Sequence, residues 1–369
     1  MNDKLILISI LFLLLIPSTF AADEVKPYLH QAAVPQHPEI KLYGQYQTQL
    51  FPGAATYSFP IEVPPGTNGL NPLINIDYNS QSTQQTVLGM GWSINRNAIE
   101  RATNGTMTLL NDDTYTMMLD GSAYLLTYNS NDGFWHTETE YFFKIQNLSG
   151  ASNDHGMYWR VIRKDGTEYR FGYSREAELT ANVSINRTIK WNLDTITDTF
   201  GNNVSFIYRE DPFTGDNGTS YVTEIQYNNE KSRRIIFSYE NAARPDRRIS
   251  FNTGAVVDQS RRLQDLSIYA NDELVRRYSF YYVLIGNSTS ALSNIVDYGN
   301  DNTTLWYNIS FSYYDLQTGY QTDSNWHTPI PFSNTNGADY GVRLVDVNND
   351  ARMDIVRAYE TGAVKEGTY

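Results

Sequence analysis

The sequence of 369 residues contains no cysteine. That absence excludes disulfide bonds, zinc–thiolate sites, a lipid-modified N-terminal cysteine and cysteine nucleophiles. Basic residues are also few, because 28 Lys and Arg stand against 41 Asp and Glu, which gives a net charge of −13. Nucleic-acid-binding proteins usually carry a basic patch, so no nucleic-acid partner is expected.

Long apolar runs are absent except at the start of the chain. Residues 5–16 form an apolar run, with Lys4 before it and a small-x-small sequence at 19–21 after it. The run is too short for a membrane-spanning helix and is typical of a signal peptide. We predict that residues 1–21 are a signal peptide, that the mature protein is secreted, and that it has no transmembrane segment.

Aromatic and turn-forming residues are abundant. Aromatic residues make up 14% of the chain, with 28 Tyr, and there are 24 Gly and 13 Pro. This composition favours short strands joined by turns, and Asn-Gly or Asp-Gly pairs between alternating runs predict hairpins. The sequence therefore predicts an all-β shell. Its first predicted strands are residues 106–110, 114–119, 123–128, 158–162 and 168–171.

A pattern recurs four times between Trp191 and Tyr314. Each unit has two apolar residues three positions apart, a polar turn, and an alternating strand that ends in Phe-x-Tyr. Because strand side chains alternate, each closing strand places an apolar row on one face, as in a repeat whose rows stack. The apolar pairs are Leu193/Ile196, Val222/Ile225, Leu263/Leu266 and Leu292/Ile295, and the closing strands contain residues 204–208, 235–239, 278–282 and 309–313.

Residues 57–94 combine two short alternating runs with loops rich in Pro and Gly. We predict that this stretch is the starting edge of the β-shell. Pro60, Pro64 and Pro65 are expected to prevent that edge from pairing with other chains. The sequence Gly89-Met-Gly91 lacks the strand–helix setting of a dinucleotide loop and is interpreted as a bulge or turn.

One segment offers oxygen side chains in the spacing of a cation loop. Asp346, Asn348, Asp350 and Asp354 occupy relative positions 1, 3, 5 and 9 between apolar runs. Ca²⁺ takes six to eight oxygen ligands, so we predict that these four residues bind Ca²⁺. An EF-hand would need Glu at position 12, where this chain has Arg357. The alternative is a solvated Asn/Asp turn.

No arrangement of residues indicates an active site. The chain has Glu176-Ala-Glu178 followed later by Ser288-Thr-Ser290, but arginine-directed ADP-ribosyltransferases carry these motifs in the reverse order. We interpret both motifs as polar surface residues. The five histidines have no partner at metal-ligand spacing, and the six tryptophans are interpreted as core residues rather than glycan-binding platforms. The chain is therefore not expected to be an enzyme.

Three segments of the opening stretch are distinctive: residues 57–66 (YSFPIEVPPG), 73–80 (LINIDYNS) and 88–93 (LGMGWS). They resemble the N-terminal domain of the SpvB family, which also opens the B component of insecticidal toxin complexes and many Rhs/YD-repeat proteins. The resemblance covers about residues 44–320. The loop at 346–354 resembles the start of an FG-GAP-type propeller repeat, with Ala351 in place of the usual Gly.

The resemblance implies many short antiparallel hairpins that form a β-sandwich or shell-like module, followed by an incomplete β-propeller-type blade. A blade needs about 40–50 residues, but the chain ends 15 residues after Asp354, so we expect a fragment of a larger protein. The predicted parts are a signal peptide (1–21), an extended arm (22–47), the SpvB-like domain (48–320), a linker (321–335) and a truncated FG-GAP-type calcium-loop segment (336–369).

The leading hypothesis is a non-enzymatic structural or delivery module of a secreted Rhs or toxin-complex B-type virulence protein. Its expected partners are other toxin-complex or Rhs polypeptides, or the missing C-terminal part of the same protein. The alternative is a secreted cell-surface adhesion or glycan-binding β protein that uses exposed Tyr and Trp side chains. An enzyme, either a remnant ADP-ribosyltransferase or a glycosidase with scattered carboxylates, is the third hypothesis.

Overall fold

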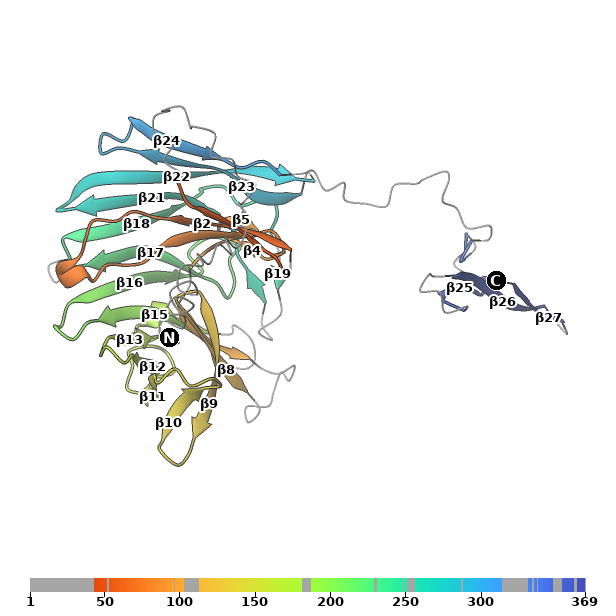
Figure 1. Ribbon diagram of the computed structural model, residues 1–369, viewed down its shortest axis with the longest axis horizontal. Coiled ribbons are helices and arrows are strands. Elements are labelled where there is room, and N and C mark those ends of the chain that lie inside the picture. Colours follow the sequence, from red (N-terminus) through yellow and green to blue (C-terminus); the bar gives the residue numbers. More distant parts are fainter. Residues whose placement is uncertain are drawn as a thin grey trace, which may run out of the picture.

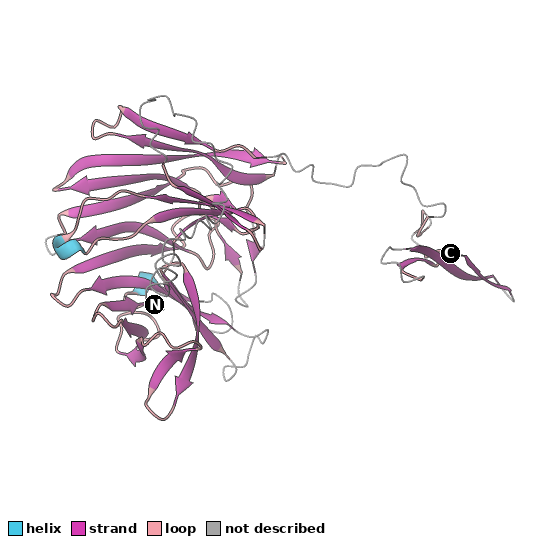
Figure 2. Cartoon of the chain, in the orientation of Figure 1, coloured by secondary structure: helices cyan, strands magenta, loops and turns pink. Residues whose placement is uncertain are grey.

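The computed structural model describes most of the chain from residue 43 onward as β-strands, with two short 3₁₀ helices, η1 (Thr67–Gly69) and η2 (Arg175–Ala177) (Figure 2). The predicted all-β fold is confirmed. No helix in the described part is long and apolar enough to cross a membrane. The described residues are 43–51, 53–95, 97–102, 113–180, 187–228, 231–247, 249–250, 256–286, 288–313, 331–333, 335–336, 338–347, 354–361 and 364–368.

The largest sheet has 16 strands, and eight of them close into a barrel (Figure 1). Closure occurs because one long strand pairs antiparallel with both the first and the last of the other seven. The barrel strands are β7 (Ala98–Ala102), β8 (Thr114–Leu119), β9 (Ser122–Asn129), β10 (Phe134–Thr137), β11 (Lys144–Ser149), β12 (Met157–Ile162), β13 (Glu168–Phe171) and β15 (Thr188–Thr197).

The barrel follows the turn signals of the sequence. Asp120 and Gly121 both have positive φ, 50° and 81°, as a two-residue hairpin turn between β8 and β9 requires. The weakest join in the barrel is between β10 and β11, which share a single register pair, Trp135 with Ile145. Its interior is filled by buried apolar side chains, among them Ile99, Met117, Leu126, Ile145, Trp159, Val161, Phe171 and Trp191.

The other strands of the large sheet continue from β15 and form the predicted repeat. Each repeat unit is one hairpin, and the four hairpins, β15–β16, β17–β18, β21–β22 and β23–β24, follow one another across the sheet in chain order. We call these eight strands the repeat sheet. Its further strands are β16 (Asn203–Glu210), β17 (Ser220–Tyr227), β18 (Arg233–Tyr239), β21 (Leu263–Ala270), β22 (Glu273–Ile285), β23 (Thr289–Tyr298) and β24 (Leu305–Ser310).

A β-bulge explains why the apolar pairs are three residues apart. Where β18 meets β21, Tyr239 lies opposite Leu263 and Ser238 lies opposite Asp265, so one additional residue is inserted in β21. Leu263 and Leu266 therefore both face the core and are fully buried. The same register shift occurs where β13 meets β15, β16 meets β17, and β22 meets β23.

The last tyrosine of each repeat unit forms the same hydrogen bond. Its hydroxyl donates to the backbone carbonyl of the first apolar residue of its unit, at a point where the backbone pairing of that hairpin has ended. We call these four contacts the tyrosine bonds. They join Tyr208 to Leu193 at 2.8 Å, Tyr239 to Val222 at 2.8 Å, Tyr282 to Leu263, and Tyr313 to Leu292 at 2.5 Å.

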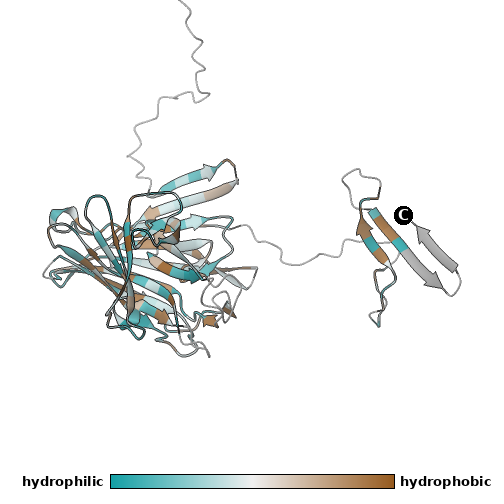
Figure 3. Ribbon diagram, turned by 90° about the horizontal axis from the view of Figure 1, so that it is seen from below, coloured by the Kyte–Doolittle hydropathy of each residue, from teal (hydrophilic) through white to brown (hydrophobic). Residues whose placement is uncertain are grey.

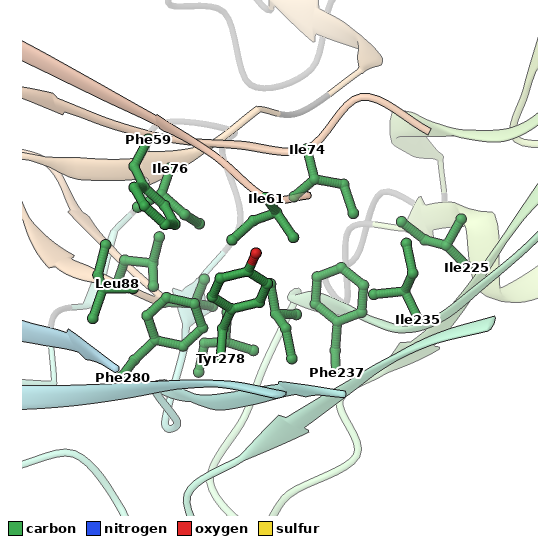
Figure 4. Close-up of a cluster of buried hydrophobic side chains, with 14 of the residues drawn as sticks. Phe59, Ile61, Ile74, Ile76, Leu88, Ile225, Ile235, Phe237, Tyr278 and Phe280 are labelled. Atoms are coloured by element: carbon green, nitrogen blue, oxygen red, sulfur yellow. The ribbon is translucent and has the colours of Figure 1, made fainter. Parts of the chain in front are cut away.

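A second, four-stranded layer packs on the repeat sheet, and we call it the covering sheet. Its strands, in spatial order, are β1 (Gln45–Gln49), β2 (Ala54–Pro60), β3 (Asn75–Asn79) and β6 (Trp92–Ile94). Figure 4 shows Phe59 and Ile76 from this layer facing Tyr278 and Phe280 from β22. The ring centroids of Phe59 and Tyr278 are 5.9 Å apart in an edge-to-face arrangement. Hydrophobic and hydrophilic residues alternate along the strands, as expected for sheets with one buried face (Figure 3).

The predicted role of the prolines was wrong. Strand β2 pairs with β1 on one side and β3 on the other, so the stretch belongs to the covering sheet and Pro60 does not lie on an edge strand. Pro64 instead offers its carbonyl to the Tyr227 hydroxyl at 2.7 Å, which anchors the loop to β17. Alternation in a sequence shows which face of a strand is buried but not which sheet the strand joins.

All the remaining strands except β14 (Glu178–Thr180), which pairs with β15 in the large sheet, form small sheets. The last of them is an antiparallel sheet of three strands, whose first hairpin flanks the predicted calcium loop. The propeller-type blade stays a prediction, and the predicted strand at 106–110 lies outside the described residues. These strands are β4 (Gln85–Thr86), β5 (Gly89–Met90), β14 (Glu178–Thr180), β19 (Ile249–Ser250), β20 (Val257–Asp258), β25 (Val342–Val345), β26 (Asp354–Thr361) and β27 (Val364–Thr368).

Candidate functional site

The distinctive residues 86–92 form a clasp between the covering sheet and the repeat sheet. Strands β4 and β5 make a small hairpin, and Gly89 has φ of +90°. A Cβ at Gly89 would lie 2.7 Å from the carbonyl oxygen of Ser290 in β23. Only glycine allows the backbone to approach the repeat sheet this closely. Gly89 therefore lies in a tight hairpin, and this hairpin also brings the backbone into contact with the repeat sheet.

The clasp is completed by Trp92 and the fourth repeat unit. The Trp92 indole Nε1 donates to the Tyr313 hydroxyl at 2.6 Å, and that hydroxyl donates to the Leu292 carbonyl. The Val87 carbonyl accepts the backbone N–H of Leu263 at 2.8 Å. Two of the four repeat units are therefore bonded directly to this short sequence.

A buried ion pair lies under the clasp. Arg244 and Asp246 are 2% and 1% exposed, and Arg244 Nε lies 2.9 Å from Asp246 Oδ1. Arg244 also donates to the Thr86 carbonyl at 2.8 Å, and Asp246 accepts the Ser290 N–H at 2.7 Å. Burial opposes ionisation, but the bonds from Arg244 and Ser290 outweigh it and lower the pKa of Asp246.

The interpretation of the Glu-x-Glu and Ser-Thr-Ser motifs as surface residues was wrong for Glu178 and Ser290, which are buried, whereas Glu176 is half-buried and Ser288 is exposed. Glu178 is buried and lies 2.9 Å from His155 Nδ1, and it also accepts the Asp154 N–H at 2.8 Å. Ser290 is fully buried beside Asp246. The spacing within the motif could not show this, because the partners of Glu178, Asp154 and His155, lie 24 and 23 residues away in the sequence. These two buried residues are therefore engaged in contacts that stabilise the fold.

One carboxyl group near the Glu-x-Glu motif, that of Glu210, has a raised pKa. Glu176 accepts the backbone N–H of Glu210 at 2.8 Å. Burial, together with the negative charges of Asp211, Glu176 and Asp154, raises the pKa of Glu210 from 4.5 to about 7. A carboxyl with such a pKa can exchange a proton near neutral pH, but in the described residues its carboxyl faces a strand N–H of Thr180 rather than a nucleophile.

A cavity of about 290 Å³ lies between the covering sheet, the repeat sheet and the barrel. Its lining mixes apolar residues with polar ones such as Asn192, whose amide donates to the Ser220 hydroxyl at 3.0 Å. Lys190, on the same wall, lies 2.7 Å from Glu100. The described lining of this cavity includes no histidine.

Two of the four predicted Ca²⁺ ligands are in the described part of the chain. Asp346 follows β25 and Asp354 begins β26, so they flank the turn of one hairpin. Asp354 Oδ2 accepts the Val347 N–H at 3.1 Å. Asn348 and Asp350 lie outside the described residues. The described residues hold no group of three or more His, Asp and Glu that could bind a metal.

The comparisons with known proteins agree with the clasp and the repeat sheet. The family model described as Salmonella virulence plasmid 65kDa B protein, SpvB, matches residues 50–304. The chain belongs to the SpvB family. The matched range includes the clasp, the whole barrel and the repeat sheet as far as β23. The resemblance seen in residues 57–66, 73–80 and 88–93 is confirmed. No curated protein matches the sequence.

Solved structures share the SpvB-family fold. The crystal structure of TcdB2-TccC3 has a TM-score of 0.64 at 15% identity, over 88% of this chain and 19% of that one. A mutant Photorhabdus luminescens Tc holotoxin pore has a TM-score of 0.63 at 16% identity, over 87% and 18%. The N-terminal domain of effector protein SpvB from Salmonella typhimurium strain LT2 has a TM-score of 0.55 at 17% identity, over 65% and 98%. The chain thus spans about a fifth of the toxin-complex chains.

Proposed function

We propose that this SpvB-family chain is a non-enzymatic structural and delivery module of a secreted toxin-complex or Rhs-type virulence protein. The observation that carries the proposal is the family match over residues 50–304, together with toxin-complex structures in which this fold is about a fifth of a longer chain. The motifs that suggested catalysis are engaged in the fold: Glu178 holds His155, and Ser290 holds Asp246. These contacts support a scaffold rather than an active site.

The expected partners are other toxin-complex or Rhs polypeptides, or a C-terminal part of the same protein. Strand β24 supports this, because in the described sheet it pairs with β23 alone and so leaves one edge open. Leu305 and Trp306 on this strand are 55% and 54% exposed. An open edge with exposed apolar side chains suits the addition of further strands.

Co-purification tests the proposed assembly. The tagged full chain is co-expressed with an Rhs-type polypeptide encoded beside it, and the complex is measured by size-exclusion chromatography with light scattering. A stoichiometric complex that Trp306→Asp weakens and the matched barrel variant Tyr128→Asp leaves intact is expected. A chain that elutes as a stable monomer with every such polypeptide contradicts the proposal.

A second assay tests the non-enzymatic part. The chain is incubated with radiolabelled NAD and candidate acceptor proteins, and no label transfer is expected. Transfer that the conservative variant Glu178→Gln abolishes, with the fold retained by circular dichroism, would show that the carboxylate is catalytic.

We also propose that Asp346, Asn348, Asp350 and Asp354 bind Ca²⁺. The position of Asp346 and Asp354 at the two ends of one hairpin loop supports this, because a cation loop must bring its oxygens together. Calorimetric titration with CaCl₂ is expected to show one site, which Asp350→Ala removes. Binding that is absent at millimolar Ca²⁺, or unchanged in Asp350→Ala, rules the site out.

A further inference from the structure

One end of the barrel contains a second cavity of about 290 Å³ that no part of the proposed function uses. Seven of the eight barrel strands each contribute one residue to its lining. Two of them, Tyr128 of β9 and Met157 of β12, are 53% and 38% exposed, so the cavity is accessible from solvent. The mouths of β-barrels are common positions for small-molecule sites. We call this cavity the barrel mouth.

Four aromatic side chains form the walls of the barrel mouth, and they are held by one another. The centroids of Tyr115 and Trp135 are 5.2 Å apart, those of Tyr128 and Trp135 are 5.4 Å apart, and those of Tyr115 and Trp191 are 5.9 Å apart. Edge-to-face and tilted packing fixes these rings before any ligand arrives. A site that is preorganised in this way loses little conformational entropy on binding.

A cationic ligand is disfavoured, because a cation already occupies the aromatic faces. The guanidinium carbon of Arg101 lies 5.2 Å from the Tyr115 ring centre and 5.6 Å from that of Trp191. Arg101 is fixed there by Asp113, at 2.8 Å, and by the Thr188 carbonyl, at 2.9 Å. Arg187 also lies 3.3 Å from Asp113, so two guanidinium groups share one carboxylate.

A purely apolar ligand is also disfavoured, because polar groups are present at the barrel mouth. Asn147 of β11 is one of the residues that line the cavity. Trp159 is fully buried behind the walls, with its ring 5.1 Å from both Tyr115 and Trp135. Its indole Nε1–H has no hydrogen-bond acceptor in the described structure, whereas that of Trp191 donates to the Met157 carbonyl at 3.1 Å. A buried donor without an acceptor costs about 1–3 kcal/mol.

We propose that the barrel mouth binds a saccharide. A sugar ring presents C–H faces to aromatic rings and hydroxyl groups to amide and guanidinium groups, and the lining of the barrel mouth contains both kinds of side chain. The rings of Tyr128 and Trp135 would stack on the sugar, and Asn147 and Arg101 would bond its hydroxyl or carboxylate oxygens. This property goes beyond the delivery role, because the site lies within the barrel and requires no partner polypeptide.

The test uses the purified full chain on an array of neutral and acidic oligosaccharides, in the presence of EDTA. The soluble form of each oligosaccharide that binds is then titrated by calorimetry into wild type and variants. Binding at least tenfold weaker in Tyr128→Ala, Trp135→Ala and Asn147→Ala is expected. The matched control Trp306→Ala, which removes an exposed tryptophan far from the barrel in sequence and sheet order, is expected to bind as wild type does.

If Trp135→Ala fails to fold, the variants of the exposed Tyr128 and the half-buried Asn147 still test the site, and their folding is checked by circular dichroism. Binding of either acidic or neutral oligosaccharides supports the site. If Arg101→Gln no longer binds the acidic oligosaccharides, Arg101 is the residue that recognises their negative charge. A wild-type chain that binds no oligosaccharide overturns the proposal. So does binding that persists in Tyr128→Ala and Asn147→Ala, or that Trp306→Ala reduces equally.

Discussion

The repeat sheet and the barrel share strand β15 but are stabilised in different ways. The repeat sheet uses one arrangement four times: a bulge brings two apolar residues onto the buried face, and a tyrosine bond follows. The barrel packs around a single hydrophobic cluster, and its neighbouring strands β10 and β11 are joined through only one register pair. Repetition with a covering layer produces a scaffold, whereas the barrel leaves an aromatic mouth open to solvent. The comparison suggests that support and recognition occupy different regions.

The largest expected effect comes from the buried ion pair under the clasp. Asp246→Ala leaves the Arg244 charge buried without a charged partner, which costs about 3–5 kcal/mol of unfolding free energy. The matched control is Asp339→Ala, because the Arg343–Asp339 pair is 63% and 55% exposed and should cost less than about 1 kcal/mol. Urea unfolding of both variants checks this. Similar costs for the two would show that the clasp contributes little.

The second effect compares glycines from the two regions. Gly89→Ala combines an unfavourable positive φ with a contact of 2.7 Å to the Ser290 carbonyl, so a loss of about 2–4 kcal/mol is expected. Gly121→Ala in the barrel turn has φ of +81° but nothing within 4 Å of its Cβ, so about 1 kcal/mol is expected. Thermal unfolding measures both. If Gly121→Ala is as destabilising as Gly89→Ala, the close approach to β23 is unimportant.

More of the fold than of the candidate site could be predicted from the sequence. The Phe-x-Tyr units and the Asp-Gly turns predict the hairpins, because both signals are local. Closure of the barrel depends on Trp191 pairing with Ile99, which are distant in the sequence, and no local pattern shows that contact. The barrel mouth was missed for the same reason. Its rings come from strands that appear separate until the barrel closes, although the excess of Tyr and Trp was the available signal.

The third effect concerns the tyrosine bonds. Tyr239→Phe removes one hydroxyl that donates to the Val222 carbonyl, so about 0.5–1.5 kcal/mol of stability should be lost. Tyr208→Phe should give a similar loss, since its bond to Leu193 has the same length. Tyr128→Phe, on an exposed ring of the barrel, should change the stability by less than about 0.5 kcal/mol. An equal loss of stability in all three variants would show that the tyrosine bonds have no special structural role.

The smallest effect is a pH dependence near the junction of the two regions. The pKa of Glu210 is raised to about 7 by burial and by nearby carboxylates. Its contribution to stability is therefore present below 4.5, its ordinary value, and is lost as the pH rises through about 7. Wild type should unfold at a lower temperature at pH 8 than at pH 6, and Glu210→Gln should reduce that difference. An unchanged difference in the variant would contradict this assignment.

Hydrogen exchange of the full chain, followed by mass spectrometry, tests the comparison most directly. It reports the local opening of each strand in the unmodified protein. Strands β17, β18, β21 and β22 are expected to exchange slowest, because repeat units lie on both sides of them and the covering sheet packs above. Strands β10 and β11 are expected to exchange much faster, since one register pair joins them. Equal protection of β10, β11, β21 and β22 would contradict the division into scaffold and barrel.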